Sequence, residues 1–390
     1  MKDFSLLQKK YIVPTYPNRG LTFVEGEGVY LKDVLGEKYL DLMTNYGVNI
    51  FGHAHPVITR RLADQLGRLT TLHGSFTNDV RAEAAQRLVG RCGGGLAQVF
   101  FSNSGAEANE AGLKFAVLAT GKKKFIRCRN GYHGKTLGSL SATDGKKYRG
   151  PFEPLLWHFT VVAYDDLGAL EAALDEETAA FIVEPVQGES GVLAPREGYL
   201  KSAGALCRSK GALLILDEVQ TGTGRTGHFL ASHSEQLSYD LVNLGKGLAG
   251  GIPVGATLVS QPVAYKIPRS SHTSTFGGNP LAAAGILAVL DLLDDERLVS
   301  IREVGDYFLK GLRTVRSGLI AETRGKGLML GLEVREKRDE ILKELQRAKI
   351  LAIPAGENVV RFLPSYILEK THVDEALEKI GSVFLALSPV

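Results

Sequence analysis

The chain has 390 residues, of which 44% are hydrophobic and 23% charged, and this ordinary globular usage excludes disorder, collagen and coiled coil as the main architecture. Lysine and arginine total 46 against 43 aspartates and glutamates, so the formal charge of +3 does not indicate a dedicated nucleic-acid binder. No apolar run is long enough to span a bilayer, and residues 1–20 lack the apolar core of a signal peptide. We therefore expect neither membrane insertion nor nucleic-acid binding.

The first fifty residues alternate apolar and polar positions around glycine-containing turns, which predicts short strands. From about residue 55 the pattern becomes helical, as in 57–69 and 79–92. Short apolar runs then alternate with amphipathic helical segments, and these runs predict about seven strands at 98–101, 124–128, 159–164, 179–184, 212–217, 240–244 and 255–260. Several runs are apolar almost throughout, which is typical of parallel strands covered on both faces.

The tail of the chain has a different character. A long helical stretch starts near residue 281, strands are predicted within 327–334, 350–355 and 359–364, and a helix at 372–387 closes the chain. The fold class is therefore α/β, with a mostly parallel sheet in a large domain and a smaller α+β domain. We expect residues 1–50 to contribute to the small domain, 51–285 to form the large domain and 286–390 to form the C-terminal small domain.

The three cysteines, Cys92, Cys128 and Cys207, are odd in number and form no CxxC pair. A disulfide framework is therefore not expected, and a reducing cytoplasm fits best.

Two polar residues follow predicted strands in the large domain. Asp217 ends the run at 212–217, and Lys246 comes just after the run at 240–244. A carboxylate at the carboxyl end of a buried parallel strand points into the crevice where α/β folds bind ligands. Taken singly, a solvated loop lysine and a helix cap or ion-pair partner explain these residues equally well.

Three other loops complete a set. Ser104, Gly105 and Ala106 lie where a strand ends and a helix begins, and a helix N-terminus suits a phosphate. An aromatic pair, Tyr132 and His133, sits in a glycine-framed loop, and Thr275 offers a hydroxyl beside a glycine turn in HTSTFGGNP.

Together these residues match the needs of pyridoxal phosphate. The lysine amine would form a Schiff base, the carboxylate would keep the pyridine nitrogen protonated, and the aromatic ring would stack on the cofactor.

At this point the sequence resembles the class-III (ω-amino-acid) aminotransferases, which are fold-type-I pyridoxal-phosphate enzymes. The resemblance covers essentially the whole chain, because six motifs occur in the family's order: NSGAEAN, YHGKT, EPVQGESG, LILDEVQTGTGRTG, LGKGLAGG and TFGGNP.

The resemblance implies a role for each site residue. Lys246 would be the Schiff-base lysine and proton shuttle, Asp217 would pair with the pyridinium, and Gln220 would approach the phenolic oxygen. The cofactor would also contact Ser104, Gly105, Ala106, Tyr132 and His133. Thr275 would reach the phosphate of the neighbouring subunit's cofactor, which implies a homodimer.

Glu189 and Arg361 resemble the family's switch pair. The arginine would bind the α-carboxylate of glutamate in one half-reaction, and the glutamate side chain would neutralise it in the other. Without the resemblance, Arg361 is equally compatible with a surface charge on a strand.

The resemblance points most closely to acetylornithine aminotransferases and to enzymes acting on lysine or ornithine bound to an acidic amino-group carrier protein. Tyr46 belongs to the motifs that favour this branch. The implied reaction moves the ω-amino group of an N-blocked ornithine or lysine to 2-oxoglutarate in arginine or lysine biosynthesis. Lys135 stands where this branch usually has an arginine that grips the donor's α-carboxylate, and a lysine cannot reproduce that bidentate contact.

An acidic carrier would suit a basic entrance, and the candidate residues for it are Lys122, Lys123, Lys124, Lys146, Lys147 and Arg149. An ordinary solvated face explains these residues equally well.

Other functions stay open at this point. The rivals are a 4-aminobutyrate or free-ornithine aminotransferase, an intramolecular aminomutase on the same scaffold, and a non-catalytic relative. Gly222, Gly224 and Gly227 satisfy GxGxxG, but no apolar helix is predicted after them, so a dinucleotide site is not expected. His53 and His55 lack a third ligand at suitable spacing, and we interpret them as turn residues before a helix that starts at Pro56.

Overall fold

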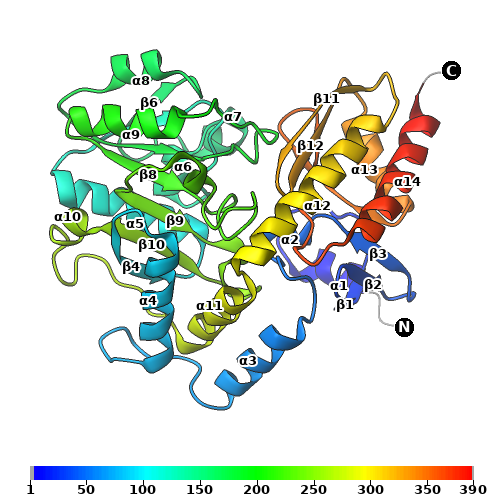
Figure 1. Cartoon of the computed structure of the whole chain (residues 1–390), viewed down its shortest axis with the longest axis horizontal. Helices are drawn as coiled ribbons and strands as arrows, with labels where there is room; N and C mark the ends of the chain where they lie inside the picture. The colour runs from blue at the N-terminus through cyan, green and yellow to red at the C-terminus, as the bar shows by residue number, and fades with distance from the viewer. Residues whose placement is uncertain (1–3, 389–390) are drawn as a thin grey trace.

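The computed structural model describes residues 4–388, which form two lobes (Figure 1). The larger lobe is built on a seven-stranded sheet. In spatial order its strands are β4 (Leu96–Ser102), β10 (Gly255–Ser260), β9 (Leu241–Leu244), β8 (Leu213–Asp217), β7 (Thr178–Val183), β5 (Lys124–Cys128) and β6 (His158–Val162). Strand β10 runs antiparallel to both neighbours, and the other pairs are parallel. The predicted α/β class and its mostly parallel sheet are thus confirmed.

Both faces of this sheet are covered by helices, so successive residues of one strand enter different cores. On β8, Ile215 packs into one apolar cluster whereas Leu214 and Leu216 pack into another. The first face carries α5 (Gly105–Thr120), α6 (Leu137–Ala142) and α10 (Gln261–Ala264), and the second carries α8 (Leu167–Ala173) and α9 (Tyr199–Ser209). Burial on both faces explains why these strands are apolar throughout.

Several shorter elements complete the larger lobe. Helix α11 (Pro280–Leu292) packs against α3 (Pro56–Leu66) and α4 (Asp79–Cys92), with Pro56 at the first helical position as expected. The remaining short helices are α7 (Lys146–Arg149) and the 3₁₀ helices η1 (Gly150–Phe152), η2 (Ala231–Glu235) and η3 (Lys246–Ala249).

The smaller lobe contains two four-stranded sheets. One comprises β1 (Phe23–Glu27), β2 (Tyr30–Asp33), β3 (Lys38–Asp41) and β13 (Ile350–Leu351), with β13 parallel to β3. The other is antiparallel and comprises β11 (Ile320–Lys326), β12 (Met329–Val334), β15 (Val359–Phe362) and β14 (Ile353–Ala355). Residues near both ends of the chain therefore share one sheet.

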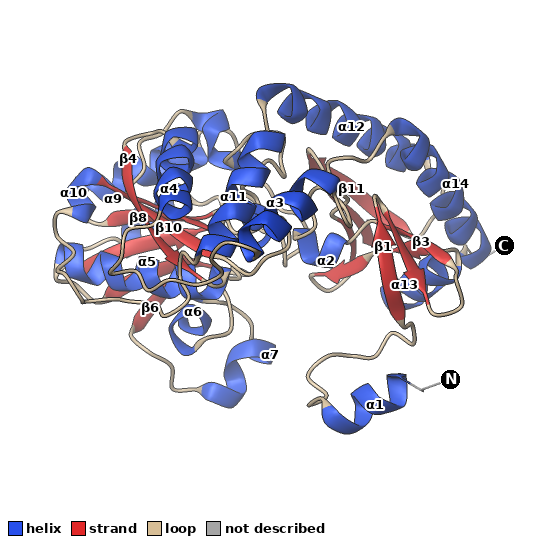
Figure 2. Cartoon of the chain, turned by 90° about the horizontal axis from the view of Figure 1, so that it is seen from below, coloured by secondary structure: helices blue, strands red, loops and turns tan. Residues whose placement is uncertain are grey.

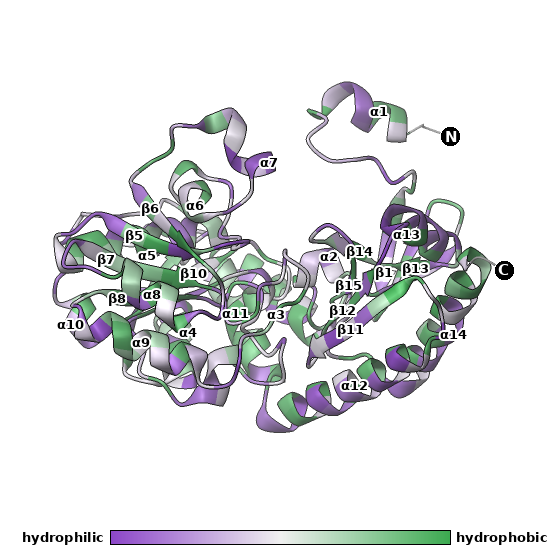
Figure 3. Cartoon of the chain, turned by 90° about the horizontal axis from the view of Figure 1, so that it is seen from above, coloured by the Kyte–Doolittle hydropathy of each residue, from purple (hydrophilic) through white to green (hydrophobic). Residues whose placement is uncertain are grey.

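Helices flank these sheets. They are α12 (Asp295–Thr314), α13 (Arg338–Arg347) and α14 (Lys370–Leu387). Hydrophobic and hydrophilic residues alternate around α12 (Figure 3), and its buried residues Leu298, Ile301, Val304 and Phe308 recur every three or four positions. Helix α1 (Phe4–Tyr11) has no buried residue and stands apart from both sheets (Figure 2).

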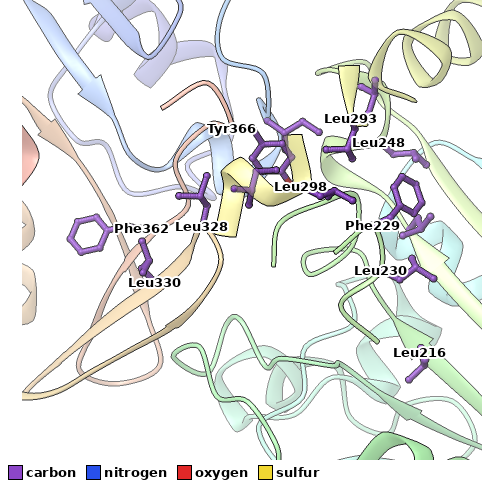
Figure 4. Close-up of a cluster of buried hydrophobic side chains, with 14 of the residues drawn as sticks. Leu216, Phe229, Leu230, Leu248, Leu293, Leu298, Leu328, Leu330, Phe362 and Tyr366 are labelled. Atoms are coloured by element: carbon purple, nitrogen blue, oxygen red, sulfur yellow. The ribbon is translucent and has the colours of Figure 1, made fainter. Parts of the chain in front are cut away.

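A single apolar core runs between the lobes. Figure 4 shows side chains of the larger lobe, such as Phe229 and Leu248, continuing through Leu293 and Leu298 to Tyr366, Leu328 and Phe362 of the smaller one. Within residues 4–388, no helix combines the length and apolarity needed to cross a membrane.

Candidate active site

The sheet gathers most of the expected site residues at one edge. Strands β4, β5, β7, β8 and β9 point the same way, so their carboxyl ends lie together. The residues that follow these ends are Ser104 and Gly105 after β4, Tyr132 and His133 after β5, Glu189 after β7, Gln220 after β8 and Lys246 after β9. Asp217 is the last residue of β8.

Asp217 is buried and surrounded by hydrogen-bond donors. Its Oδ2 accepts from Asn109 Nδ2 at 2.7 Å and lies 2.7 Å from His133 Nδ1, while its Oδ1 accepts from Val219 N at 3.0 Å. Each of these neighbours can donate a hydrogen bond, so both oxygens of the Asp217 side chain serve as acceptors.

Lys246 opens η3 with a φ of 46°, a left-handed conformation that is uncommon outside glycine. Burial lowers the pKa of its amine, and the carboxylates of Glu189 and Asp217 act in the opposite direction. The charge of Asp217 thus acts on the buried amine of Lys246.

Helix α5 presents its N-terminus to the same edge. Ser104 is the N-cap, with its Oγ accepting from Glu107 N at 3.2 Å. The first intrahelical hydrogen bond runs from Ala108 N to Ser104 O, so the amides of Gly105 and Ala106 precede the helical ladder. A Cβ on Gly105 would lie 2.4 Å from Val219 Cγ1, which explains the glycine.

The loop after β5 holds the aromatic pair. Tyr132 N donates to Glu184 Oε2 at 2.9 Å, and the Tyr132 ring makes an edge contact with Tyr148 at 5.7 Å between centroids. Burial, helped by the negative charge of nearby Asp217, raises the pKa of Glu184 well above its ordinary value. His133 is buried, and its Nε2 has no hydrogen-bond partner among the described residues.

Glu189 and Arg361 form an ion pair between the lobes. Arg361, fully buried on β15, donates from Nη2 to Glu189 Oε1 at 2.8 Å. Gln220 lies between them: its Oε1 accepts from Arg361 Nη1 at 2.8 Å, and its Nε2 donates to Glu189 Oε1 at 3.3 Å. Burial by itself would raise the pKa of Glu189, but Arg361 and Lys246 hold it below its ordinary value.

Tyr46 reaches this pair through an unusual turn. The short helix α2 (Thr44–Gly47) has positive φ at all four residues, a left-handed run that Asp41 and Leu363 hold through hydrogen bonds to Thr44. The Arg361 guanidinium lies 5.8 Å from the centre of the Tyr46 ring. A run of this kind costs backbone energy and is typical of functional sites.

Lys135 and Thr275 lie at the periphery. Both are exposed, and Lys135 Nζ lies 5.3 Å from the centre of the Tyr148 ring. Tyr148 in turn interacts electrostatically with Glu189, Tyr46 and Arg361, so it links Lys135 to the buried pair.

Lys122, Lys123 and Lys124 do not lie at the edge of the sheet that carries the site. The expectation that they line a basic entrance is therefore wrong. Lys124 is the first residue of β5, so Lys122, Lys123 and Lys124 lie at the amino end of a strand whose carboxyl end faces the site. Lys124 pairs with Asp175, and Lys122 donates to Gly211 O. By contrast, Lys146, Lys147 and Arg149 lie on α7 beside Tyr148.

The two misleading motifs have structural explanations. Gly222, Gly224 and Gly227 lie in turns followed by η2, and no α-helix opens there. His53 bonds to Asp41 Oδ2 at 2.8 Å, and His55 precedes α3. In the described part of the chain, no cluster of three or more His, Cys, Asp or Glu residues could hold a metal ion.

Sequence reasoning missed four residues of this site: Glu184, Asn109, Asn243 and Tyr148. Glu184 and Asn109 lie inside two of the six motifs, and Asn243 interrupts an apolar strand, so each left a local signal. The contact of Tyr148 with Tyr132 could not be read locally, because only tertiary packing brings α7 to that loop.

Comparison with known proteins identifies the family. Residues 12–384 match the family model described as aminotransferase class-III. The chain belongs to this family. It is 41% identical over 379 residues to the acetylornithine aminotransferase of Aquifex aeolicus, covering 96% of this chain and 99% of that one. It is also 41% identical over 367 residues to a [LysW]-aminoadipate semialdehyde/glutamate semialdehyde transaminase of Sulfurisphaera tokodaii, covering 93% and 95% of the two chains.

Solved structures agree with this assignment. The ornithine aminotransferase of Toxoplasma gondii, described with partial occupancy of PLP at its active site, superposes with a TM-score of 0.94 at 35% identity, covering 99% of this chain and 94% of that one. The chain is therefore an ω-aminotransferase with pyridoxal 5′-phosphate as its cofactor, which confirms the predicted enzyme class and cofactor.

The geometry fits this cofactor. The α5 N-terminus offers amides to a phosphate, and a Cβ on Gly134 would lie 2.8 Å from Ala106 Cβ, so the aromatic loop closes directly over the helix start. Asp217 and the amine of Lys246 are both buried at this edge of the sheet, and the Asp217 carboxylate acts to raise the pKa of that amine.

Proposed function

We propose that this aminotransferase moves the ω-amino group of an N-blocked ornithine or lysine to 2-oxoglutarate, giving a semialdehyde and glutamate, in cytoplasmic arginine or lysine biosynthesis. The blocked donor is N-acetylornithine or a carrier-bound lysine or ornithine. The observation that carries the proposal is the ion pair between fully buried Arg361 and partly buried Glu189, whose pKa the charge of Lys246 lowers. The names of the relatives from Aquifex aeolicus and Sulfurisphaera tokodaii support the same class of donors.

The ion pair gives one site two specificities. While Glu189 neutralises Arg361, the site accepts an amine whose near end carries no carboxylate. When Glu189 moves away, the planar guanidinium is free to grip the α-carboxylate of glutamate or 2-oxoglutarate in bidentate fashion. Gln220 contacts both partners and can keep a hydrogen bond to Arg361 in either state.

When bound, pyridoxal phosphate supplies an electrophilic carbon and an electron-withdrawing ring. In the proposal, Lys246 would hold the cofactor covalently, and its amine would accept and return the proton that the transfer reaction moves. Its lowered pKa makes the neutral amine more accessible at physiological pH. Asp217 would pair with the ring nitrogen, Tyr132 would pack against the ring, and the Ser104–Ala106 segment would hold the phosphate.

Lys135 is the proposed receptor for the carboxylate at the far end of the donor. The Tyr148 ring holds its ammonium by a cation–π contact at the mouth of the site. A lysine attracts a carboxylate as a point charge without fixing its plane, which tolerates different blocking groups on the neighbouring nitrogen.

Two interaction partners belong to the proposal. One is a second copy of the chain, which places the exposed Thr275 at the neighbour's cofactor phosphate in a homodimer. The other is an acidic amino-group carrier protein, attracted by Lys146 and Lys147, which are exposed on α7 near Lys135.

The test compares donors with the purified holoenzyme and 2-oxoglutarate. We expect glutamate to form from N-acetylornithine or carrier-bound lysine with a higher kcat/KM than from free ornithine or 4-aminobutyrate. A preference for either free donor would replace the proposal with the 4-aminobutyrate or free-ornithine activity. Turnover that needs no 2-oxoglutarate would indicate an aminomutase instead.

The role of Lys135 has its own test. Lys135→Ala should raise KM for the blocked donor about tenfold or more and raise KM for the keto acid acceptor by a smaller factor, because Arg361 still binds the acceptor's α-carboxylate. Lys123→Ala is the matched control, since Lys123 is exposed at the other edge of the sheet. Equal effects of the two substitutions would contradict the assignment.

A further inference from the structure

A directed chain of buried amides ends on Asp217. Asn243 Nδ2 on β9 donates to Asn109 Oδ1 on α5 at 2.7 Å, and Asn109 Nδ2 donates to Asp217 Oδ2 at 2.7 Å. The same Asn109 Nδ2 donates its second proton to the backbone oxygen of His133 at 2.7 Å. Asn109 is 1% and Asn243 0% exposed, so no solvent competes with these bonds.

The backbone oxygen of His133 fixes the direction of the chain. A carbonyl oxygen only accepts, so the amide of Asn109 must turn its nitrogen toward His133 and Asp217. Its oxygen then faces Asn243, which must donate. The direction leaves Asn243 Oδ1 buried without a partner among the described residues. A buried acceptor without a partner costs free energy. We interpret this cost as offset by the hydrogen bond that Asn109 makes to Asp217 at the other end of the chain of amides.

Space for the chain is built into the fold. A Cβ on Gly112, one turn along α5 from Asn109, would lie 2.8 Å from Asn243 Nδ2. The glycine thus lets a polar side chain of the central sheet reach the helix, where β9 otherwise carries apolar residues that pack into the core.

We propose that Asn109 and Asn243 are positioning residues that hold the Asp217 carboxyl group turned toward the ring nitrogen of the cofactor. Asn109 and His133 occupy Oδ2 from behind, and this fixes the rotation of the carboxyl group. Asn243 acts through Asn109 and does not contact Asp217. The inference rests on the proposed role of Asp217.

Cofactor affinity and spectrum test the proposal. We expect Asn243→Ala, and the equally sized Asn243→Asp, to raise the Kd of pyridoxal phosphate about tenfold and to shift the absorption maximum of the bound cofactor. Asn109→Ala should have the same effects. The variant that carries both substitutions should bind the cofactor with the same Kd as Asn109→Ala alone, because Asn243 acts only through Asn109. Kd is measured by equilibrium dialysis on the refilled apo-protein.

Thr257→Val is the matched control. Thr257 is 0% exposed, pairs with Asn243 across the sheet and donates to Ala108 O on the same helix at 2.8 Å, but it is not part of the chain. It should lower thermal stability as Asn243→Ala does and leave the Kd and the spectrum unchanged.

Equal changes in Kd for Thr257→Val and Asn243→Ala, or strictly additive effects of the two asparagines, would overturn the proposal. Asp217→Ala separates the two levels of failure. If that variant kept its affinity for the cofactor, the assigned role of Asp217 would be wrong. If Asp217→Ala lost affinity but the asparagine variants kept the Kd and the spectrum, only the role of Asn109 and Asn243 would be wrong.

Discussion

At the scale of single residues, Lys246 combines two unfavourable conditions. Its backbone is left-handed, and its amine is in a site that disfavours charge. Three carboxyl groups, those of Glu189, Asp217 and Glu184, raise its pKa and offset part of the effect of burial. The surrounding structure therefore fixes the position of an amine whose pKa is lowered. A lysine on the surface would have neither property.

Lys246→Ala should remove covalent attachment of the cofactor and lower kcat by at least about a hundredfold, because the covalent partner and the proton carrier disappear together. Borohydride reduction followed by mass spectrometry measures attachment. A reduced adduct of unchanged yield in the variant would show that a different lysine binds the cofactor.

The Glu189–Arg361 pair makes stability depend on pH. Because Arg361 and Lys246 keep the pKa of Glu189 low, the pair stabilises the fold above the ordinary glutamate pKa and loses this contribution as the pH falls. We expect Glu189→Gln to cost about 1–3 kcal/mol near neutral pH and clearly less near pH 4. Urea unfolding at the two pH values checks this. A cost that stays constant or grows on acidification would contradict it.

At the scale of elements, the strands of the large sheet could be predicted because they are apolar on both faces, and all seven expected runs coincide with strands. Strand β11 was missed. Its sequence, IAETRGK, is mostly polar, and it lies at the edge of its sheet with an irregular register, so pairing with β12 defines it. The left-handed turn at Thr44–Gly47 has no sequence signature beyond Asn45 and Gly47, two residue types that tolerate a left-handed backbone.

The site residues also divide into those that local sequence patterns predict and those that tertiary packing brings together. Residues carried by strand ends and helix starts could be predicted, because the sheet brings those ends together. The Glu189–Arg361 pair was expected from the resemblance. The contacts of Tyr148 with Tyr132 and of Arg361 with Gln220 could not be predicted, since they depend on how α7 and the smaller lobe pack against the large sheet.

The cap of α5 serves both helix and site. Ser104→Ala should destabilise the protein by about 1 kcal/mol through loss of the N-cap bond and should also raise the Kd of the cofactor. Asp166→Ala removes an equivalent cap from α8, where Asp166 Oδ1 accepts from Ala169 N at 2.9 Å. That variant should lose similar stability at unchanged Kd. A Kd that rises equally in both variants would show that Ser104 has no specific role at the site.

At the scale of the whole molecule, Arg225 joins the lobes. It is 1% exposed, its Nη1 donates to the backbone oxygens of Leu328 and Pro364, and its guanidinium lies 4.8 Å from the centre of the Tyr366 ring. Burial lowers its pKa, and no carboxylate of the described residues forms an ion pair with it. The GxGxxG segment thus connects the two lobes through the hydrogen bonds of Arg225, and it does not form a nucleotide-binding loop.

Arg225→Ala should cost about 2–4 kcal/mol, from a cavity and two carbonyl groups left without donors. Arg196→Ala is the control, because the Arg196 side chain is 79% exposed and its pair with Asp165 contributes little. Guanidinium unfolding followed by fluorescence measures both. Equal midpoints for the two variants would show that the contacts of Arg225 do not stabilise the molecule.

The pairing of β3 with β13 has a consequence for synthesis. Residues 38–41 are synthesised long before their partner strand at 350–351, because most of the large lobe lies between them in the sequence. The edge of β3 therefore waits, unpaired, while the seven-stranded sheet, complete by residue 260, can already assemble. The order of synthesis therefore allows the larger lobe to fold first. The smaller lobe, which carries Arg361, completes its sheet only afterwards.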